Sequence, residues 1–431
     1  MLKEFLLQDA PEAIQSILTD DFDFTAQESV GYLVANRSGA AQIYAREIDL
    51  FLARSRSDPK TQAKILRILY EARAIAFDRA DLDRKIDYDH KICHYHEKVG
   101  DSCALCAQAC PEGAIVKDEE THRLKYAADL CSSCAKCVGV CPTGAIELGA
   151  LGSFAFEKIA RLYEGLIPLI VDEKTIENLE ACSLPSGVAP FVVPNGDMLS
   201  ETALLTLLQE SGSQIVTACE ISAQAQRVLN DVWGAIYGKK AILTIGEIDA
   251  AQPIVSSDYA ADLSGLNARA VFATRLRRAV GDRDFGIVES DRFGAIEVDW
   301  DRCSLCAACA QNCVSAALSA DETEGVLRAC DALCSLCGEC GAICPEKAIA
   351  IKGGAIALNP SWFAQRVVAK DEAFFCVECG KPFATSKSIA KTIAVIAPLF
   401  AGDEAKIRSL SCCAECKPKV MIKAMLEYKN A

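Results

Sequence analysis

The feature that most constrains this chain is a run of four cysteines closed by a proline: Cys334, Cys337, Cys340, Cys344 and Pro345. An upstream run has the same spacing, with members Cys303, Cys306, Cys309 and Cys313, and twenty residues lie between Cys313 and Cys334. In paired runs of this kind, the first three thiolates bind one [4Fe-4S] cluster and the fourth binds the cluster of the other run. The two runs therefore predict two interlocked iron–sulfur sites.

The same module occurs earlier in the chain. A shift of 203 residues maps seven of the eight cysteines onto other cysteines without a gap: Cys103, Cys106, Cys110, Cys131, Cys134, Cys137 and Cys141. Only Cys303 has no counterpart, because it maps onto Gly100. Two structural zinc sites per module are the alternative, but zinc sites rarely use interlocked four-cysteine runs. We therefore expect two dicluster ferredoxin-like modules and four [4Fe-4S] clusters.

Gly100 leaves the first module one ligand short. Cys93 lies ten residues before Cys103, and the polar residues 95–102 between them can loop back. Thiolate is the usual ligand of iron–sulfur clusters, so Cys93 is the favoured replacement. The alternatives are His94, His96, Asp101 or a cluster that lacks one iron.

The crossing pattern then gives each cluster a ligand set, and we number the sites in chain order. Site one takes Cys93, Cys103, Cys106 and Cys141, and site two takes Cys131, Cys134, Cys137 and Cys110. Site three takes Cys303, Cys306, Cys309 and Cys344, and site four takes Cys334, Cys337, Cys340 and Cys313. Cys330 has no partner in the repeat, so we expect a buried thiol there.

The C-terminal region has a third metal pattern. Two C-x-x-C pairs, Cys376 with Cys379 and Cys413 with Cys416, are separated by 33 residues. This spacing suits a tetrahedral four-cysteine Zn²⁺ site, and a fifth iron–sulfur cluster is the alternative. Cys412 competes with Cys413, but only Cys413 gives the two-residue spacing. Zinc would stabilise a tail that has little core of its own.

Composition indicates the compartment and the kind of partner. The 24 cysteines follow metal spacings, and neither a signal peptide nor an apolar run of about 18 residues is present, so we expect a cytoplasmic protein without a membrane span. The formal charge is −14, and metal loading would bring it to about −24. Such a charge disfavours nucleic acid and favours a basic patch on a redox partner protein.

The remaining sequence predicts an α+β multidomain chain. We expect a mainly helical N-terminal region at 1–86, the first dicluster module at 87–149, an α/β segment at 150–290, the second dicluster module at 291–359 and a metal-binding, zinc-ribbon-like tail at 360–431. The N-terminal region should contain a strand at Val30–Ala35 and helices at Ile43–Leu52 and Gln62–Leu82.

The α/β segment alternates apolar runs with helical periods, which is typical of a parallel sheet of the Rossmann or flavodoxin kind. Strands are expected at Ile167–Val171, Pro190–Val193, Gln214–Ala218 and Ala241–Ile245, and helices at Met198–Glu210 and Ile221–Tyr237. No glycine-rich nucleotide motif follows a strand, so the segment is interpreted as a spacer and docking platform. Cys182 and Cys219 should be isolated thiols. Arg275, Arg277, Arg278 and Arg283 form a basic cluster, interpreted as a solvated helix face or a docking patch.

The layout resembles a known group of proteins. Its opening Cys93-His94, its run from Cys103 to Pro111 and its tail segment Phe375–Phe383 are similar to bacterial multicluster 4Fe-4S ferredoxin-like proteins. The resemblance covers most of the chain after residue 85. It implies that an early cysteine replaces the missing ligand, as Cys93 would here, and that the partner is a formate dehydrogenase or another molybdoenzyme.

These expectations describe an electron-transfer protein, a polyferredoxin that relays electrons between redox partners. No paired carboxylates, nucleophile elbow or histidine-rich open metal site predicts catalysis by the chain itself. It would serve an oxidoreductase as its electron-transfer subunit. The alternative is a non-redox or redox-sensing accessory factor, in which the clusters are structural and the other domains bind a client enzyme.

Overall fold

The computed structural model describes residues 86–100, 103–149, 152–172, 184–254, 263–321 and 324–430, with residue 175 and scattered positions between 55 and 72. The chain forms two compact units. The first contains Met1–His96 and Ala104–Val288, and the second contains Glu97–Cys103 and Glu289–Ala431. The predicted strand Val30–Ala35 and helix Ile43–Leu52 lie outside the described residues, as does Cys182.

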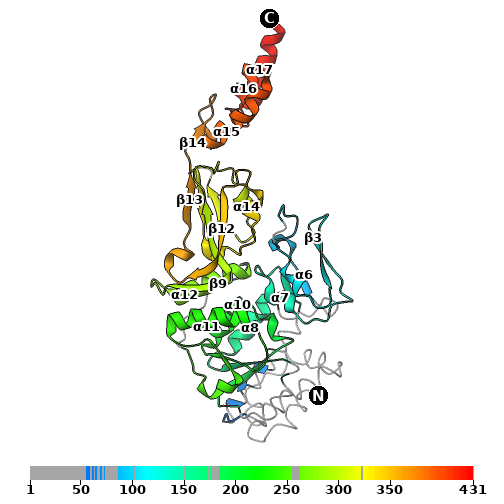
Figure 1. The fold of residues 1–431 in the computed structure, drawn as a ribbon, viewed down its shortest axis with the longest axis vertical. Coiled ribbons are helices and arrows are strands. Elements are labelled where there is room, and N and C mark those ends of the chain that lie inside the picture. The colour runs from blue at the N-terminus through cyan, green and yellow to red at the C-terminus, as the bar shows by residue number, and fades with distance from the viewer. Residues whose placement is uncertain are drawn as a thin grey trace, which may run out of the picture. The chain divides into compact units, whose positions relative to one another are not determined.

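A four-stranded parallel sheet forms the centre of the first unit (Figure 1). Its order is β6-β5-β7-β8, with bounds Val188–Val193, Ile167–Asp172, Ile215–Thr217 and Ile242–Thr244. Each strand overlaps a predicted apolar run. Leu169 and Ile170 at the centre of β5 are fully buried, as is Val216 of β7. Because these strands are covered on both faces, they consist of continuous apolar residues rather than alternating ones.

Four helices accompany the sheet: α8 (Ser153–Leu162), α10 (Glu201–Ser211), α11 (Ala223–Tyr237) and α12 (Ala268–Val280). Capping side chains determine where three of these helices begin. Ser200, Ser222 and Asn267 each accept a hydrogen bond from the third backbone N–H of the helix that follows. Helices α10 and α11 end at Gly212 and Gly238, both left-handed, a conformation that glycine adopts without steric cost.

Part of the N-terminal region pairs with the segment that precedes β6. Ser55 forms a parallel bridge with Leu184, and the Arg56 N–H donates to the Leu184 carbonyl oxygen at 2.9 Å. Ile65, Ile68 and Leu69 are buried at helical positions, in agreement with the predicted apolar face of that segment.

Arg275 shows that the solvated-face interpretation of the arginine cluster is wrong for this residue. Its side chain is 2% exposed, and its guanidinium lies 2.7 Å from Glu210 and 3.4 Å from Glu157. Arg278 on the same helix is exposed. The sequence pattern could not separate these two residues, because the carboxylates that neutralise Arg275 come from α10 and α8.

The first cysteine module also belongs to the first unit. Strands β1 (Ile86–Tyr88) and β4 (Ile146–Leu148) pair, as do β2 (Ile115–Asp118) and β3 (Arg123–Tyr126), both antiparallel. The short helices α6 (Leu105–Ala109) and α7 (Lys136–Val140) each carry cysteines, and the turn η2 spans His90–Ile92.

Helix α7 joins this module to the parallel-sheet domain. It packs on the turn η4 (Gly196–Met198), where a Cβ on Gly139 would lie 1.9 Å from the Asp197 carbonyl oxygen. The Lys136 ammonium pairs with the Asp197 carboxylate at 3.0 Å. Only glycine permits this approach of two backbones.

The second unit contains the second cysteine module. Its strands form one two-stranded and one three-stranded sheet: β9 (Ile287–Val298) with β12 (Ile349–Ala357), and β10 (Leu318–Asp321), β11 (Val326–Ala329) and β13 (Arg366–Lys370). The short helices are α13 (Ala308–Gln311) and α14 (Glu339–Ile343), with turns η6 (Asp331–Leu333) and η7 (Pro360–Phe363). Strand β13 lies inside the predicted tail range 360–431, yet it pairs with β11 of the module.

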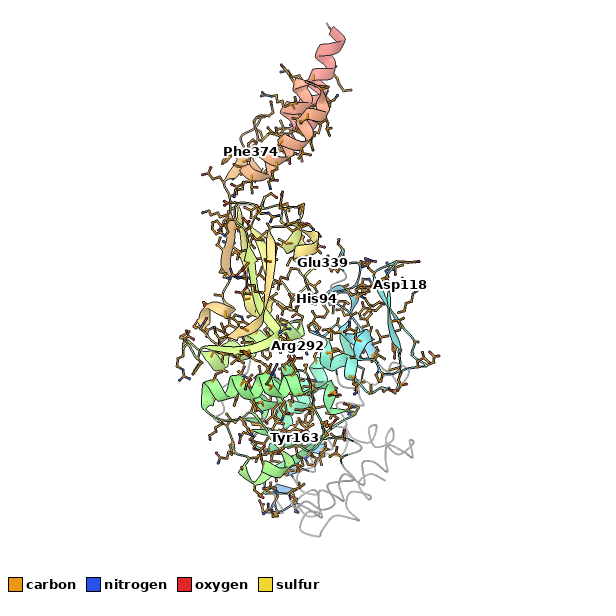
Figure 2. The ribbon with its side chains drawn as sticks, in the orientation of Figure 1. His94, Asp118, Tyr163, Arg292, Glu339 and Phe374 are labelled. Carbon is orange, nitrogen blue, oxygen red and sulfur yellow. The ribbon has the colours of Figure 1, made fainter. Side chains whose placement is uncertain are left out.

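The rest of the tail consists of a hairpin and helices. Its elements are β14 (Ala373–Phe375), β15 (Pro382–Thr385), α15 (Ser386–Ile396), η8 (Ala397–Phe400), α16 (Glu404–Ser409) and α17 (Lys417–Asn430). Figure 2 labels Phe374 on β14. Among the described helices of the chain, none is both long and apolar enough to cross a membrane.

Candidate metal centres

The four cysteines predicted for site three lie together. One small cavity of the second unit is lined by the thiols of Cys303, Cys306, Cys309 and Cys344. Apolar side chains, among them Leu327 and Ile349, complete its walls. The cavity thus joins three cysteines of one run to the fourth cysteine of the next, which is the crossing that the spacing predicts.

Site four lies beside site three in the same apolar core. Cys334 and Cys340 are buried with Cys309, and Cys313 packs against them. Desolvation, then the nearby thiols of Cys337, Cys334 and Cys313, raise the pKa of Cys340 to about 12. Four thiols at such a place cannot all ionise unless a cation neutralises them.

Site two has the same arrangement in the first unit. Its cavity is lined by Cys110, Cys131, Cys134 and Cys137. Desolvation, followed by the other three thiols, raises the pKa of Cys137 to about 12. The Tyr126 hydroxyl also faces this set, and desolvation together with a hydrogen bond to Cys131 raises its pKa. Sequence reasoning missed Tyr126, which no cysteine spacing marks.

At site one, three of the four predicted thiols surround one tyrosine. Desolvation raises the pKa of Tyr88, and a hydrogen bond to Cys93 and the charges of Cys93, Cys106 and Cys141 raise it further. Cys93 is 7% exposed and accepts a hydrogen bond from the Tyr95 N–H at 3.4 Å. The fourth predicted ligand, Cys103, belongs to the segment Glu97–Cys103 of the second unit.

Neither of the two candidate histidine ligands is an exposed surface residue. His94, labelled in Figure 2, is 4% exposed. The Nδ1 atom of His96 lies 3.4 Å from the Tyr88 hydroxyl, and its ring centroid lies 4.8 Å from that of His90. Cys93 and His96 therefore both approach the Tyr88 hydroxyl.

The backbone conformation at one position is the same in most of the cysteine runs, although the residue there differs. The residue before each short helix is left-handed in three runs: Ala135 (φ 58°), Ala307 (φ 59°) and Gly338 (φ 83°). In the first run the equivalent residue, Ala104, is not left-handed and has φ −161° and ψ 25°. This run is the one that has Gly100 in place of its first cysteine.

The backbone around Gly100 forms hydrogen bonds with a buried glutamate. Within the second unit, the backbone N–H groups of Val99 and Gly100 donate to the two carboxylate oxygens of Glu339, each at 3.0 Å. Glu339 begins α14, precedes Cys340 and is 3% exposed (Figure 2). No motif marked Glu339, because its partners are backbone groups more than 200 residues away in sequence.

Donors to sulfur recur after the fourth cysteine of each run. The N–H four residues on donates to sulfur in two runs, from Ala114 to Cys110 at 3.3 Å and from Ala348 to Cys344 at 3.4 Å. In the other two runs, a hydroxyl two residues on lies 3.7 Å from the sulfur: Thr143 at Cys141 and Ser315 at Cys313. Such donors stabilise thiolate and tune cluster potentials.

The tail brings its four predicted cysteines together. One sulfur from each of Cys376, Cys379, Cys413 and Cys416 lies within 4.8 Å of the others. Although desolvation opposes it, backbone hydrogen bonds from Cys413, Cys379 and Glu378 lower the pKa of Cys376 to about 6. Cys412 is also buried, but its sulfur donates to the Arg408 carbonyl oxygen at 3.5 Å. This geometry fits a four-thiolate metal site and favours Cys413 over Cys412.

Two further thiols outside the runs fall among the described residues, and they differ in burial. Cys330 is buried, as predicted, and donates to the Phe363 carbonyl oxygen at 3.4 Å. Cys219 follows β7 and is half-buried. Desolvation and the charge of Asp172 raise its pKa to about 11.

Comparison with known families gives one match. Residues 101–145 are similar to the 4Fe-4S dicluster domain, and this range includes seven of the cysteines of sites one and two. A comparison with curated proteins found no match. The chain therefore contains a ferredoxin-like iron–sulfur domain of the kind that serves electron transport.

Proposed function

We propose that the chain is a polyferredoxin with four [4Fe-4S] clusters that relays electrons between redox partner proteins. The proposal rests on one observation above the others. Cavities in two different units are each lined by three cysteines of one run and the fourth of its neighbour. A zinc site needs no such crossing, whereas paired ferredoxin clusters depend on it. The match at residues 101–145 supports the same chemistry.

The protein's own groups would hold and tune the clusters. The ligand sets are those given for sites one to four, with Cys93 completing site one. When bound, each cluster would accept and release one electron. Apolar residues such as Leu327 and Ile349 wall the cavity of site three, and the amides of Ala114 and Ala348 stabilise the negative charge of the sulfurs to which they donate. Sites three and four share one apolar core, which favours short electron-transfer distances between them.

The tail site would hold one Zn²⁺ with a structural role. Four thiolates leave no open coordination position, so the metal would fix the fold rather than react. The tail also contacts the loop of site three: the Thr385 hydroxyl donates to the Ser304 carbonyl oxygen at 3.1 Å, and Lys387 donates to that of Trp300 at 2.7 Å. Zinc would thereby support a cluster loop at a distance.

The partner is proposed from charge and resemblance. A chain of formal charge −14 suits a basic surface on a soluble enzyme, with association that weakens as salt increases. The multicluster proteins that this sequence resembles accompany formate dehydrogenases and other molybdoenzymes, so an enzyme of that kind is the proposed partner. We also propose a cytoplasmic location, because free thiols persist in a reducing compartment.

The second candidate function is an accessory factor whose clusters are structural. The exposed apolar residues of the tail favour it, since Val395, Leu399 and Met425 are each at least 67% exposed and offer a binding face for a client. The two functions differ in their redox behaviour. A relay is reduced reversibly by one electron per cluster, whereas a structural cluster need not be.

Anaerobic purification followed by EPR during stepwise dithionite reduction separates the two. The relay predicts several overlapping S = 1/2 signals that return to silence on oxidation. A protein that loses its iron during one reduction cycle would support the accessory role. Cys330→Ala is the matched control, because its thiol is buried but lies outside every proposed ligand set.

A further inference from the structure

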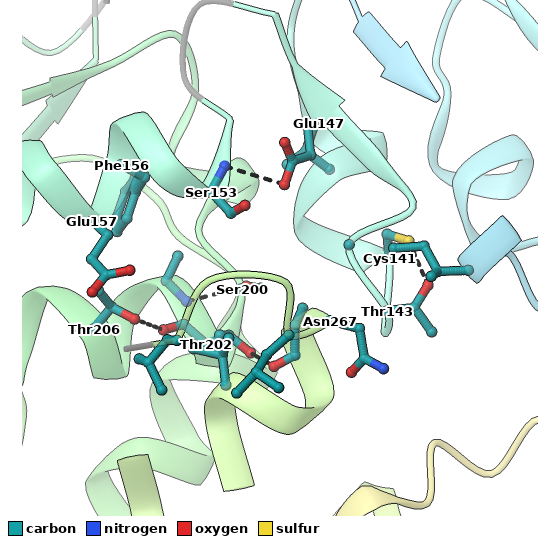
Figure 3. A pocket seen from close by; sticks show the side chains of 18 of the residues that line it. Cys141, Thr143, Glu147, Ser153, Phe156, Glu157, Ser200, Thr202, Thr206 and Asn267 are labelled. Carbon is teal, nitrogen blue, oxygen red and sulfur yellow. Dashed lines mark hydrogen bonds between the residues drawn. The ribbon is translucent and has the colours of Figure 1, made fainter. Parts of the chain in front are cut away.

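A large cavity in the first unit is separate from the small metal-site cavities. It measures about 670 Å³ and lies where the first cysteine module meets helices α8, α10 and α12 (Figure 3). The module contributes Cys141 and Thr143 to its wall. Cavities of this volume are the usual size of small-molecule sites.

The wall is largely apolar and well fixed. Its apolar members include Val138, Phe156, Met198, Leu263 and Val271. Phe156 is only 6% exposed, and its ring stands edge-on to that of Phe191 at 5.5 Å between centroids. Burial of a flat hydrocarbon ring against such a wall is favourable, because it removes apolar area from water on both sides.

The charged residues of the wall do not favour an anion. Glu147, Glu157, Lys158 and Arg161 line the cavity and together carry no net charge. Arg161 is paired with Glu157, and the Glu147 carboxylate accepts a hydrogen bond from the Ser153 N–H at 3.2 Å. A phosphate-bearing ligand would find no excess of positive charge here, so a neutral ligand fits better.

Hydroxyl groups on α10 and at its N-cap give the cavity a few polar positions (Figure 3). The Thr202 and Thr206 hydroxyls donate to the carbonyl oxygens of Ala268 and Thr202. Ser200 uses its oxygen as an acceptor for the Ala203 N–H at 3.3 Å, and a hydroxyl that accepts can still donate. The Ser200 hydroxyl therefore keeps its proton for a carbonyl oxygen of a ligand, whereas those of Thr202 and Thr206 are already used.

We propose that this cavity binds a quinone-class compound, a neutral flat ring with two carbonyl oxygens. The redox part of this proposal rests on the proposed function, because Cys141 is a predicted ligand of site one. Reduction of one quinone to the hydroquinone takes two electrons and two protons. Two reduced [4Fe-4S] clusters of the first module, each oxidised by one electron, supply the electrons, and water supplies the protons.

The test measures binding to the full chain, purified anaerobically in its oxidised state. The probe is 2,3-dimethyl-1,4-naphthoquinone, whose methylated positions prevent addition of thiols, and the method is equilibrium dialysis. Ala203→Phe places a ring inside the cavity and should weaken binding about tenfold or more. Ala223→Phe, at the exposed start of α11, is the matched control and should bind as the native chain does.

A second measurement follows reoxidation of the dithionite-reduced protein by the same quinone, after removal of dithionite. Ala203→Phe should slow it and Ala223→Phe should not. Absence of saturable binding, or equal binding by both variants, overturns the inference, as does displacement of the probe by flavin mononucleotide. An iron-loaded protein that binds no quinone contradicts this inference alone. A protein that binds quinone but carries no iron contradicts the proposed function instead.

Discussion

The N–H of Gly100 donates to the Oε2 atom of Glu339 at 3.0 Å, and this pair occupies the position where the cysteine repeat is broken. Glu339→Ala removes the acceptor for both Val99 and Gly100. Since bonds to a charged acceptor are worth about 1.5–3 kcal/mol, the amides of this segment should exchange with solvent roughly tenfold faster or more. Hydrogen exchange with mass spectrometry measures the change. Glu324→Ala, an exposed residue of the same unit, should leave it unaltered. Unchanged exchange at Val99 in Glu339→Ala would contradict the role of this contact.

Cys93→Ala tests the ligand set of site one. The variant should lose one cluster, so the iron content should fall from about 16 to about 12 atoms per chain. His96→Ala is the matched comparison, because His96 approaches the same Tyr88 hydroxyl. Iron analysis and EPR of the two variants decide between them. Loss of a cluster in His96→Ala but not in Cys93→Ala would assign the ligand to the histidine.

Some parts of the fold and of the candidate sites could be predicted from the sequence, and others could not. The parallel strands were predictable because β5 and β7 are continuous apolar runs, and the cysteine groups were predictable because spacing alone defines them. The conformation of Ala104 was not, because Ala104 occupies the same position in its run as the left-handed Ala307. Arg275 was misread because burial depends on Glu210, which lies 65 residues earlier in the chain. Contacts between residues far apart in sequence leave no local pattern.

Arg275→Ala should destabilise the first unit. The substitution leaves the largely buried carboxylates of Glu157 and Glu210 without this partner, which costs about 3–5 kcal/mol for a broken buried ion pair. Arg278→Ala, on the exposed side of α12, should change stability by less than about 0.5 kcal/mol. Urea unfolding followed by far-UV circular dichroism compares the two. Equal midpoints would show that the Arg275 pairs contribute nothing.

Cys379→Ala tests the tail. Loss of one of four thiolates should remove the zinc, and bound zinc should fall from about one atom per chain to nearly none. Because Thr385 and Lys387 contact the loop of site three, the iron of that site should also become easier to extract with a chelator. Cys412→Ala is the control and should retain zinc. Full zinc content in Cys379→Ala would rule out this ligand set, and iron in place of zinc in the native tail would favour a fifth cluster.

The central claim is that sixteen cysteines hold four [4Fe-4S] clusters, and metal analysis of the anaerobically purified full chain tests it most directly. We predict about 16 iron and 16 acid-labile sulfide per chain, with about one zinc. Dithionite should convert the clusters to EPR-active states that air-free oxidation reverses. A protein with about five zinc atoms, no sulfide and no colour would contradict the claim.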